Sequence, residues 1–233
     1  MPPLYRYERE RMKKMNLKLR EPCQPEPRWP SAAALGAVAV LHYALPSALS
    51  PGPDWLVPLL VLAFTTPALI SHRIRAYRAA QVFGYVALCT VTVMTLASLG
   101  LLVAGLPSHK ETPLQLLISA ACLWASNVLI FASWYWRLDA GGPHQRDLRG
   151  AHTDGAFLFP QMMLDLELRE QMGEQDWRPG FVDYLFLAFN TSTAFSPTDV
   201  PVLSRWAKVL MMLQAAISLA TLAILAARAV NIL

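Results

Sequence analysis

Charged residues are scarce in this chain. Aspartate, glutamate, lysine and arginine make up 15% of its 233 residues, whereas 55% are apolar and the mean hydropathy is +0.34. An ordinary soluble domain has a smaller fraction of apolar residues and a larger fraction of charged residues. The composition therefore excludes an ordinary soluble domain and predicts an integral membrane protein.

Cysteine is also scarce, and the three residues Cys23, Cys89 and Cys122 are far apart. They form no C-x-x-C pair, so we expect neither a disulfide framework nor a zinc site and interpret them as small buried side chains. The sequence shows no nucleophile beside a base and no convergent carboxylates. We therefore expect no enzyme and no cofactor.

Apolar runs long enough to cross a membrane recur along the chain. A hydrocarbon core about 30 Å thick needs about twenty helical residues. We expect four spans before a C-terminal hairpin: Ser31–Leu49, Trp55–Ile70, Ala79–Leu106 and Pro113–Trp136. The predicted fold class is an all-α, polytopic helical membrane protein. Its expected regions are a basic tail (1–30), the four-helix region (31–136), a polar loop (137–180) and the hairpin (181–233).

The segments outside the predicted spans alternate between a high and a low content of lysine and arginine. The first thirty residues contain eight of them and the link after the second span holds Arg73, Arg75 and Arg78, whereas residues 50–54 hold none. Because basic residues resist translocation, both rich segments should be cytoplasmic. We expect a multi-pass protein of the plasma membrane with its N-terminus inside. The tail is either an amphipathic helix on anionic lipid or a partly disordered topogenic segment, and we expect no nucleic-acid partner.

The polar loop offers residue types that bind metal ions. Asp139, His144, His152 and Asp154 all lie in it, and imidazole and carboxylate are ordinary ligands. Their spacing matches no ligand motif, so we expect a solvated loop, with a metal site as the alternative. Within the loop, Gln161–Met172 is predicted to be a short amphipathic helix.

The C-terminal hairpin, from about residue 177 to 230, resembles the pore module of potassium-channel-like cation channels. Phe181–Phe186 is similar to the aromatic start of a pore helix, and Ala207–Lys208 to the pair that opens the inner helix. The residues at the family's filter-like positions are Thr191, Thr193, Ala194, Phe195, Ser196, Pro197, Thr198 and Asp199. The resemblance implies a homo-oligomer, a tetramer if channel-like, and monovalent cations. The loop Leu138–Gly142 and Phe159-Pro160 also make the chain similar to uncharacterised bacterial integral membrane proteins.

The filter-like segment lacks the glycines of a potassium filter. Those glycines let successive carbonyls point at the pore axis, whereas Pro197 fixes its own φ and restricts Ser196. We therefore expect no potassium selectivity. The segment forms either a wider mouth lined by side chains, able to pass partly hydrated cations, or a capped turn between two helices.

Two helices carry polar stripes on otherwise apolar surfaces. In the last helix the stripe consists of Gln214, Ser218, Thr221 and Arg228, and in the fourth span of Ser119, Ser126 and Ser133. Polar groups in a membrane face protein or water rather than lipid. The serine stripe favours helix packing. The Gln214 stripe favours packing and a conduction path equally, and we expect it to face the Phe181–Asp199 segment.

The number of crossings stays open between five and six. Four spans return the chain to the cytoplasm at Arg137, so Phe181–Ser196 is either a thin sixth crossing or a loop that re-enters from the cytoplasm. Asn190 and Thr191 favour re-entry, because polar backbone at depth must be buried in protein or line a cavity. The predicted function is an ion-channel-like membrane protein with a degenerate filter. A non-conducting scaffold or accessory subunit is the alternative.

Overall fold

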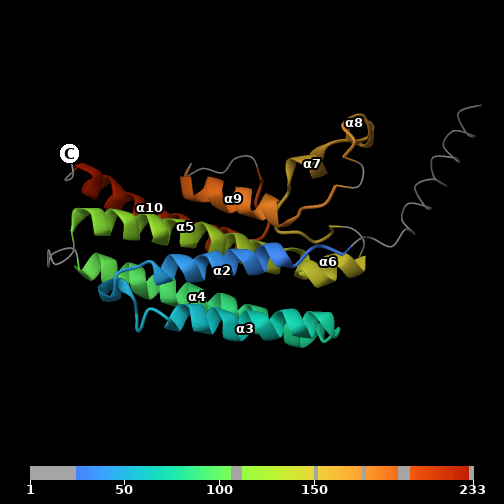
Figure 1. Cartoon of the computed structure of the whole chain (residues 1–233). Helices are drawn as coiled ribbons and strands as arrows, with labels where there is room; N and C mark the ends of the chain where they lie inside the picture. The colour runs from blue at the N-terminus through green and yellow to red at the C-terminus, as the bar shows by residue number, and fades with distance from the viewer. Residues whose placement is uncertain (1–24, 106–111, 150–151, 175–176, 194–199, 231–233) are drawn as a thin grey trace, which may run out of the picture.

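The structure is a computed structural model that describes residues 25–105, 112–149, 152–174, 177–193 and 200–230, with only the backbone of 166 and 228–230. Its described part is helical, and one isolated antiparallel bridge joins Phe157 and Val202. The helices are α2 (Trp29–Tyr43), α3 (Leu56–Arg73), α4 (Tyr77–Gly105), α5 (Pro113–Leu138), α6 (Pro143–Arg149), α7 (Pro160–Met163), α8 (Leu166–Gln171), α9 (Phe181–Thr193) and α10 (Arg205–Val230) (Figure 1).

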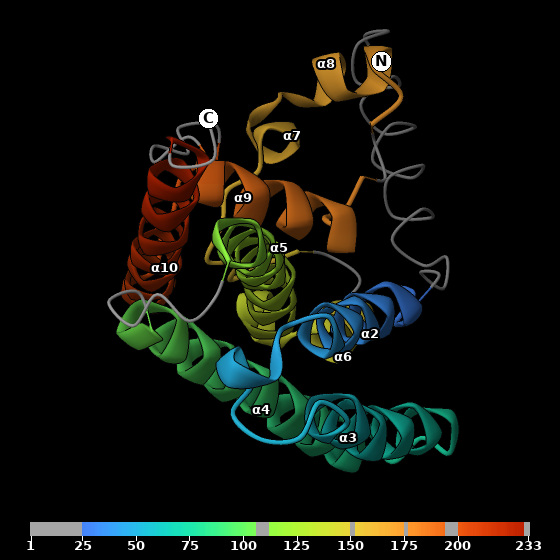
Figure 2. The ribbon, with the colours of Figure 1, turned by 60° about the vertical axis from the view of Figure 1, so that its left-hand side comes forward.

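Helix α5 is the central element of the bundle. It packs against α2 and α4 on one side and against α9 and α10 on the other, while α3 lies outside against α4 (Figure 2). Its start is fixed by a capping box, in which Thr112 and Gln115 satisfy each other's backbone N–H groups. Large side chains such as Phe131, Tyr135 and Trp136 are fully buried along it. A helix that is apolar all round belongs in an interior, and α5 occupies it.

Four helices, α3, α4, α5 and α10, are long and apolar enough to cross a membrane. Outward-facing side chains on three of them are large and apolar: Leu59, Leu62, Val82, Val93, Val209 and Met212. Such surfaces suit lipid, which imposes no penalty on exposed hydrocarbon. The predicted all-α, polytopic membrane fold is confirmed. Cys89 also lies exposed on α4, which corrects the expectation that it is buried.

The first predicted span is shorter than expected. Helix α2 ends at Tyr43, and a separate 3₁₀ turn covers Ser47–Leu49. Pro46 explains the break, because it disfavours helical geometry at Leu45 and has no N–H to continue the helix. The predicted helix Gln161–Met172 is likewise two helices, α7 and α8, separated where Asp165 caps α8 by accepting a hydrogen bond from the Leu168 N–H at 2.8 Å.

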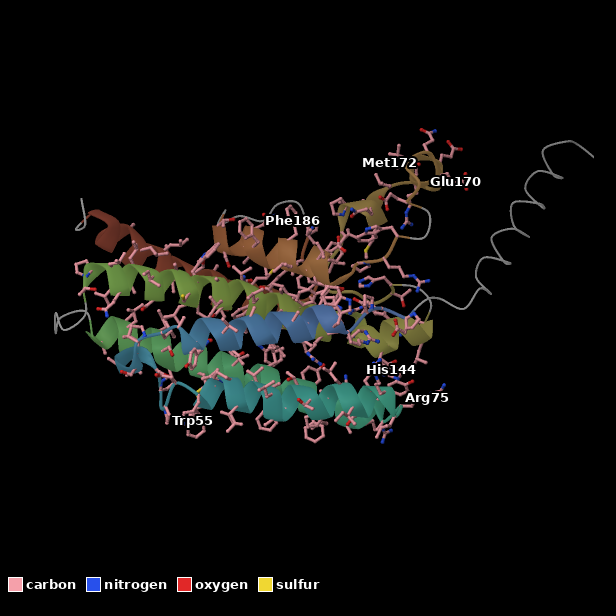
Figure 3. All side chains as sticks on the ribbon, in the orientation of Figure 1. Trp55, Arg75, His144, Glu170, Met172 and Phe186 are labelled. Carbon is pink, nitrogen blue, oxygen red and sulfur yellow. The ribbon has the colours of Figure 1, made fainter. Side chains whose placement is uncertain are left out.

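The links between consecutive helices lie at two opposite ends of the bundle. Arg75 marks the end where α3 stops and α4 begins, and Asp54 lies at the opposite end, next to Trp55 (Figure 3). Helices α2 and α4 run from the Arg75 end to the Asp54 end, whereas α3 and α5 run back (Figure 1). The polar segment that follows α5 therefore lies at the Arg75 end. The basic tail of residues 1–24 lies outside the described residues.

Candidate functional site at the α9–α10 hairpin

Helix α9 is a short helix with one face buried against α5 and α10. Phe181, Tyr184, Leu187, Ala188 and Thr191 recur at helical spacing and are buried. At its start, the Asp183 carboxylate accepts a hydrogen bond from the Gly180 N–H at 2.7 Å, which satisfies a backbone group that the helix leaves unpaired. The packed face and the cap together hold α9 along the bundle.

The exposed face of α9 is apolar. Val182, Phe186 and Phe189 are 72%, 55% and 46% exposed. Phe186 points away from the bundle in Figure 3. Trp124 on α5 packs against the Phe189 ring at 5.9 Å between centroids, but Val182 and Phe186 lie outside this contact and meet lipid or another protein surface.

Helices α9 and α10 both begin at the Arg75 end. The Phe181 ring packs on Trp136 near the end of α5, at 6.0 Å between centroids, and Trp206 packs on Phe157, at 6.2 Å. Ahead of α10, the Leu158 N–H donates to the Pro201 carbonyl at 3.0 Å and the Leu203 N–H donates to the Ala156 carbonyl at 2.8 Å. The chain thus returns to its starting end after α9 (Figure 1).

This return decides between the two arrangements that the sequence left open. With 13 residues, α9 is about 20 Å long at 1.5 Å per residue, too short for a hydrocarbon core of about 30 Å. Its carboxyl end lies beside Ser218, halfway along α10. This geometry agrees with the re-entrant arrangement, whereas a sixth crossing would place the start of α10 at the opposite end of the bundle.

Gln214 on α10 connects this helix to both α9 and α5. Its side-chain amide donates to the Ala188 carbonyl at 2.7 Å and to the Ser192 hydroxyl at 2.8 Å, and its oxygen accepts from the Tyr135 hydroxyl. Asn127 on α5 donates to the Gln214 backbone carbonyl at 3.2 Å. All these side chains are buried. The predicted contact between Gln214 and the segment that begins at Phe181 is confirmed.

The rest of the stripe is buried to a similar degree. Ser218 donates to the Ser192 carbonyl at 2.6 Å, which adds a second contact to α9. Thr221 is fully buried, and its hydroxyl bonds to the carbonyls of its own helix at Ile217 and Ser218. The side chain of Arg228 lies outside the described residues. Within one chain, the described part of the stripe faces protein and not a water-filled path.

The filter-like positions divide between the end of α9 and the linker that follows it. Thr191 is buried and its hydroxyl donates to the Leu187 carbonyl at 2.8 Å, while the exposed Thr193 bonds to the Phe189 carbonyl at 3.0 Å. The remaining six positions, Ala194, Phe195, Ser196, Pro197, Thr198 and Asp199, lie outside the described residues. The hydroxyls of the described threonines therefore bond back to carbonyls of their own helix.

The serine stripe of α5 is a packing feature. Ser119, Ser126 and Ser133 are all buried, and the first and third hydroxyls donate to α5 carbonyls, those of Gln115 and Leu129. Small side chains at this spacing let neighbouring helices approach closely. The structure agrees with the packing interpretation.

Asp139 has a structural role that the sequence did not predict, since its sequence position suggested only a possible metal ligand. It follows α5, is fully buried, and accepts hydrogen bonds from the Ala156 N–H at 2.5 Å and the Tyr184 hydroxyl at 2.7 Å. The His152 Nε2 lies 3.0 Å from its carboxylate. Burial by itself raises the pKa of Asp139, but the bonds from His152 and Tyr184 hold it below its ordinary value. Asp139 thereby fastens the polar loop and α9 to the end of α5.

The four loop residues of the metal-site alternative do not lie together. Asp139 and His152 meet, but His144 stacks on Tyr77 at 4.0 Å between centroids, and Asp154 lies 3.7 Å from Arg149. No group of three metal-binding side chains gathers among the described residues. The one signal in the sequence for the role of Asp139 was its position, as an acidic residue directly after an apolar span. Its partners are distant in sequence, so no local motif marks the contact.

Comparison with known proteins adds nothing to the geometry of the hairpin. No family model, no curated protein and no solved structure matches this chain.

Proposed function

We propose that this chain is a multi-pass protein of a bacterial inner membrane, with a cytoplasmic N-terminus. In a homo-oligomer, its α9–α10 hairpin serves as a pore-loop module that passes monovalent cations without selectivity for potassium. One observation carries the proposal: α9 is a half-length helix whose chain returns to the end at which it began. That is the arrangement by which pore-loop channels bring a filter segment to the middle of a membrane.

The direction of α9 supports cations as the permeant species. The carboxyl end of a helix carries a partial negative charge, and α9 ends at Thr193, level with Ser218 in the middle of α10. The filter-like segment starts directly after it. With Pro197 in place of a glycine, such a segment coordinates ions through side chains and water. This geometry favours weak discrimination between sodium and potassium.

The exposed face of α9 supports an oligomer. A pore-loop module must surround a shared axis, and Val182 and Phe186 leave an apolar face of the re-entrant helix uncovered in one chain. A neighbouring copy would cover it.

A non-conducting scaffold is the second candidate, and the burial of the polar stripe favours it. Gln214, Ser218 and Thr221 are each fully buried inside one chain, so they hold α9 in place without lining a path. A scaffold needs this packed hairpin and no shared axis.

Flux into liposomes separates the two functions. Purified protein should pass sodium and potassium at similar rates, and Asp199→Asn should slow both, because a carboxylate at a pore mouth concentrates cations. Asp54→Asn, which removes the same charge from the exposed turn before α3, should leave flux unchanged. Absent flux from a monomeric protein would establish the scaffold, and strong potassium selectivity would refute the interpretation of the filter.

A further inference from the structure

A cavity of about 80 Å³ opens at the Arg75 end between α3, α4 and the segment that joins α5 to α6. It lies away from the hairpin. Its polar lining residues are Arg28, His72, Tyr77, Gln81, Arg137 and His144. Two of the rings are stacked, Tyr77 on His144 at 4.0 Å, and His72 meets the Tyr77 edge at 5.7 Å. The cavity thus has an ordered wall rich in hydrogen-bond donors.

Positive charge exceeds negative charge around this cavity. Three guanidinium groups, those of Arg28, Arg137 and Arg146, lie within 5.9 Å of the centre of the Trp136 ring. Arg28 pairs with Asp147, and Arg146 pairs with Glu26 at 2.8 Å. Three cations against two carboxylates leave one positive charge uncompensated.

Arg137 carries that uncompensated charge. Within the described part of the chain it forms no ion pair, and its Nε is buried without a hydrogen-bond partner. A buried cation without a counter-ion is costly, and every other guanidinium at this site has one. Its guanidinium lies over the Trp136 ring at 5.6 Å and lines the cavity, so an anion in the cavity would supply the counter-ion.

Gly84 on α4 makes room for the Arg137 guanidinium. A Cβ at this position would lie 2.6 Å from the Arg137 Cζ, closer than contacts allow. The guanidinium therefore lies directly on the α4 backbone and faces the cavity. Any larger residue at position 84 would displace the charge without removing it.

The surroundings indicate which anion fits. Ala68, Leu69 and Ala80 form an apolar wall of the same cavity, and Leu69 is 43% exposed on the membrane-facing side of α3. The link with Arg73 and Arg75 lies at this end, and Figure 3 places Arg75 and His144 there together. We propose that the cavity binds the phosphate of an anionic phospholipid headgroup, with Arg137 as its principal ligand and the acyl chains along α3. Arginine binds phosphate through paired hydrogen bonds.

Thermal unfolding of the full chain in detergent micelles tests this proposal. Short-chain phosphatidylglycerol should raise the unfolding midpoint in a concentration-dependent way, because a ligand that binds only the folded state stabilises it. Short-chain phosphatidylcholine should raise it less, because its choline carries a compensating charge. Arg137→Gln should weaken the apparent affinity for phosphatidylglycerol about tenfold to a hundredfold, the effect of losing hydrogen bonds from a charged group.

Two further variants keep the test independent of folding. Arg78→Gln removes a charge from an exposed position at the same end of the bundle and should leave the lipid-induced shift intact. Gly84→Ala keeps the charge but moves the guanidinium, and should reduce the shift. The proposal is overturned if Arg137→Gln and Arg78→Gln respond alike, or if phosphatidylcholine matches phosphatidylglycerol. An Arg137-dependent shift with inorganic phosphate alone, equal to that with lipid, would instead assign the site to soluble phosphate and overturn the headgroup.

Discussion

Gln214→Leu is the substitution that tests most directly how α9 is held in the bundle. Leucine fits the space of glutamine but cannot hydrogen-bond, so three bonds are lost: those with the Tyr135 hydroxyl, the Ala188 carbonyl and the Ser192 hydroxyl. The bond from Asn127 remains, because it uses the Gln214 backbone carbonyl. The change therefore removes the bonds of the Gln214 side chain to α9 and to Tyr135 on α5. It leaves the bond of Ser218 to α9 and the bond of Asn127 to the α10 backbone.

The expected loss of stability follows from these contacts. Side-chain hydrogen bonds between membrane helices average about 0.6 kcal/mol each, so three of them amount to about 2 kcal/mol. The buried Tyr135 hydroxyl is also left without its partner, at a cost of about 1–3 kcal/mol. The leucine side chain gains little in return, since lipid is as apolar as the protein interior. We expect the free energy of unfolding to fall by about 3–5 kcal/mol.

Titration with sodium dodecyl sulfate in mixed micelles measures the free energy of unfolding, and hydrogen exchange of the α9 amides shows where the loss occurs. Ala216→Leu is the matched control, because Ala216 is exposed on the opposite face of α10, and it should change stability by less than about 0.5 kcal/mol. Tyr135→Phe combined with Gln214→Leu should cost less than the sum of the two single changes. If Gln214→Leu equals Ala216→Leu in stability and leaves α9 exchange unchanged, these bonds do not hold α9.

Two further predictions concern the ends of the bundle. The first uses single cysteines at Arg75, Arg205 and Asp54 in a background without the native cysteines. Because the chain returns to the Arg75 end after α9, the cysteines at 75 and 205 should react with an impermeant reagent from one side of the membrane and the cysteine at 54 from the other side. Reaction of positions 54 and 205 from the same side would contradict re-entry. Because the pKa of Asp139 lies below its ordinary value of 3.8, its carboxylate stabilises the fold above that pH, and this contribution is lost as the pH falls through the lowered pKa. Asp139→Asn should reduce the fall of the unfolding midpoint at acid pH, whereas Asp54→Asn should not. If the unfolding midpoint of Asp139→Asn falls with pH as steeply as that of the unsubstituted protein, Asp139 is not the source of the fall.

The sequence by itself determined the class of this protein and the approximate places of its long helices. Apolar runs of membrane length and their flanking prolines are local signals, and the helices α3, α4 and α5 begin and end within about three residues of the predicted bounds. The polar stripe of α10 was equally readable, because a buried glutamine on an apolar helix must face protein. The early end of α2 was also encoded locally, in Pro46, although the apolar run continues past it.

Only the tertiary structure decided how the C-terminal hairpin and the polar loop are arranged. Residues 181–196 are compatible with a thin span or a re-entrant helix, and the choice depends on the contacts of Pro201 and Leu203 with residues 156–158. Asp139 meets Tyr184 across 45 positions of sequence, and the Arg137 guanidinium meets Gly84 across the α4–α5 contact. Such pairings leave no periodic signal, because they depend on how whole helices pack and not on the spacing within any one of them.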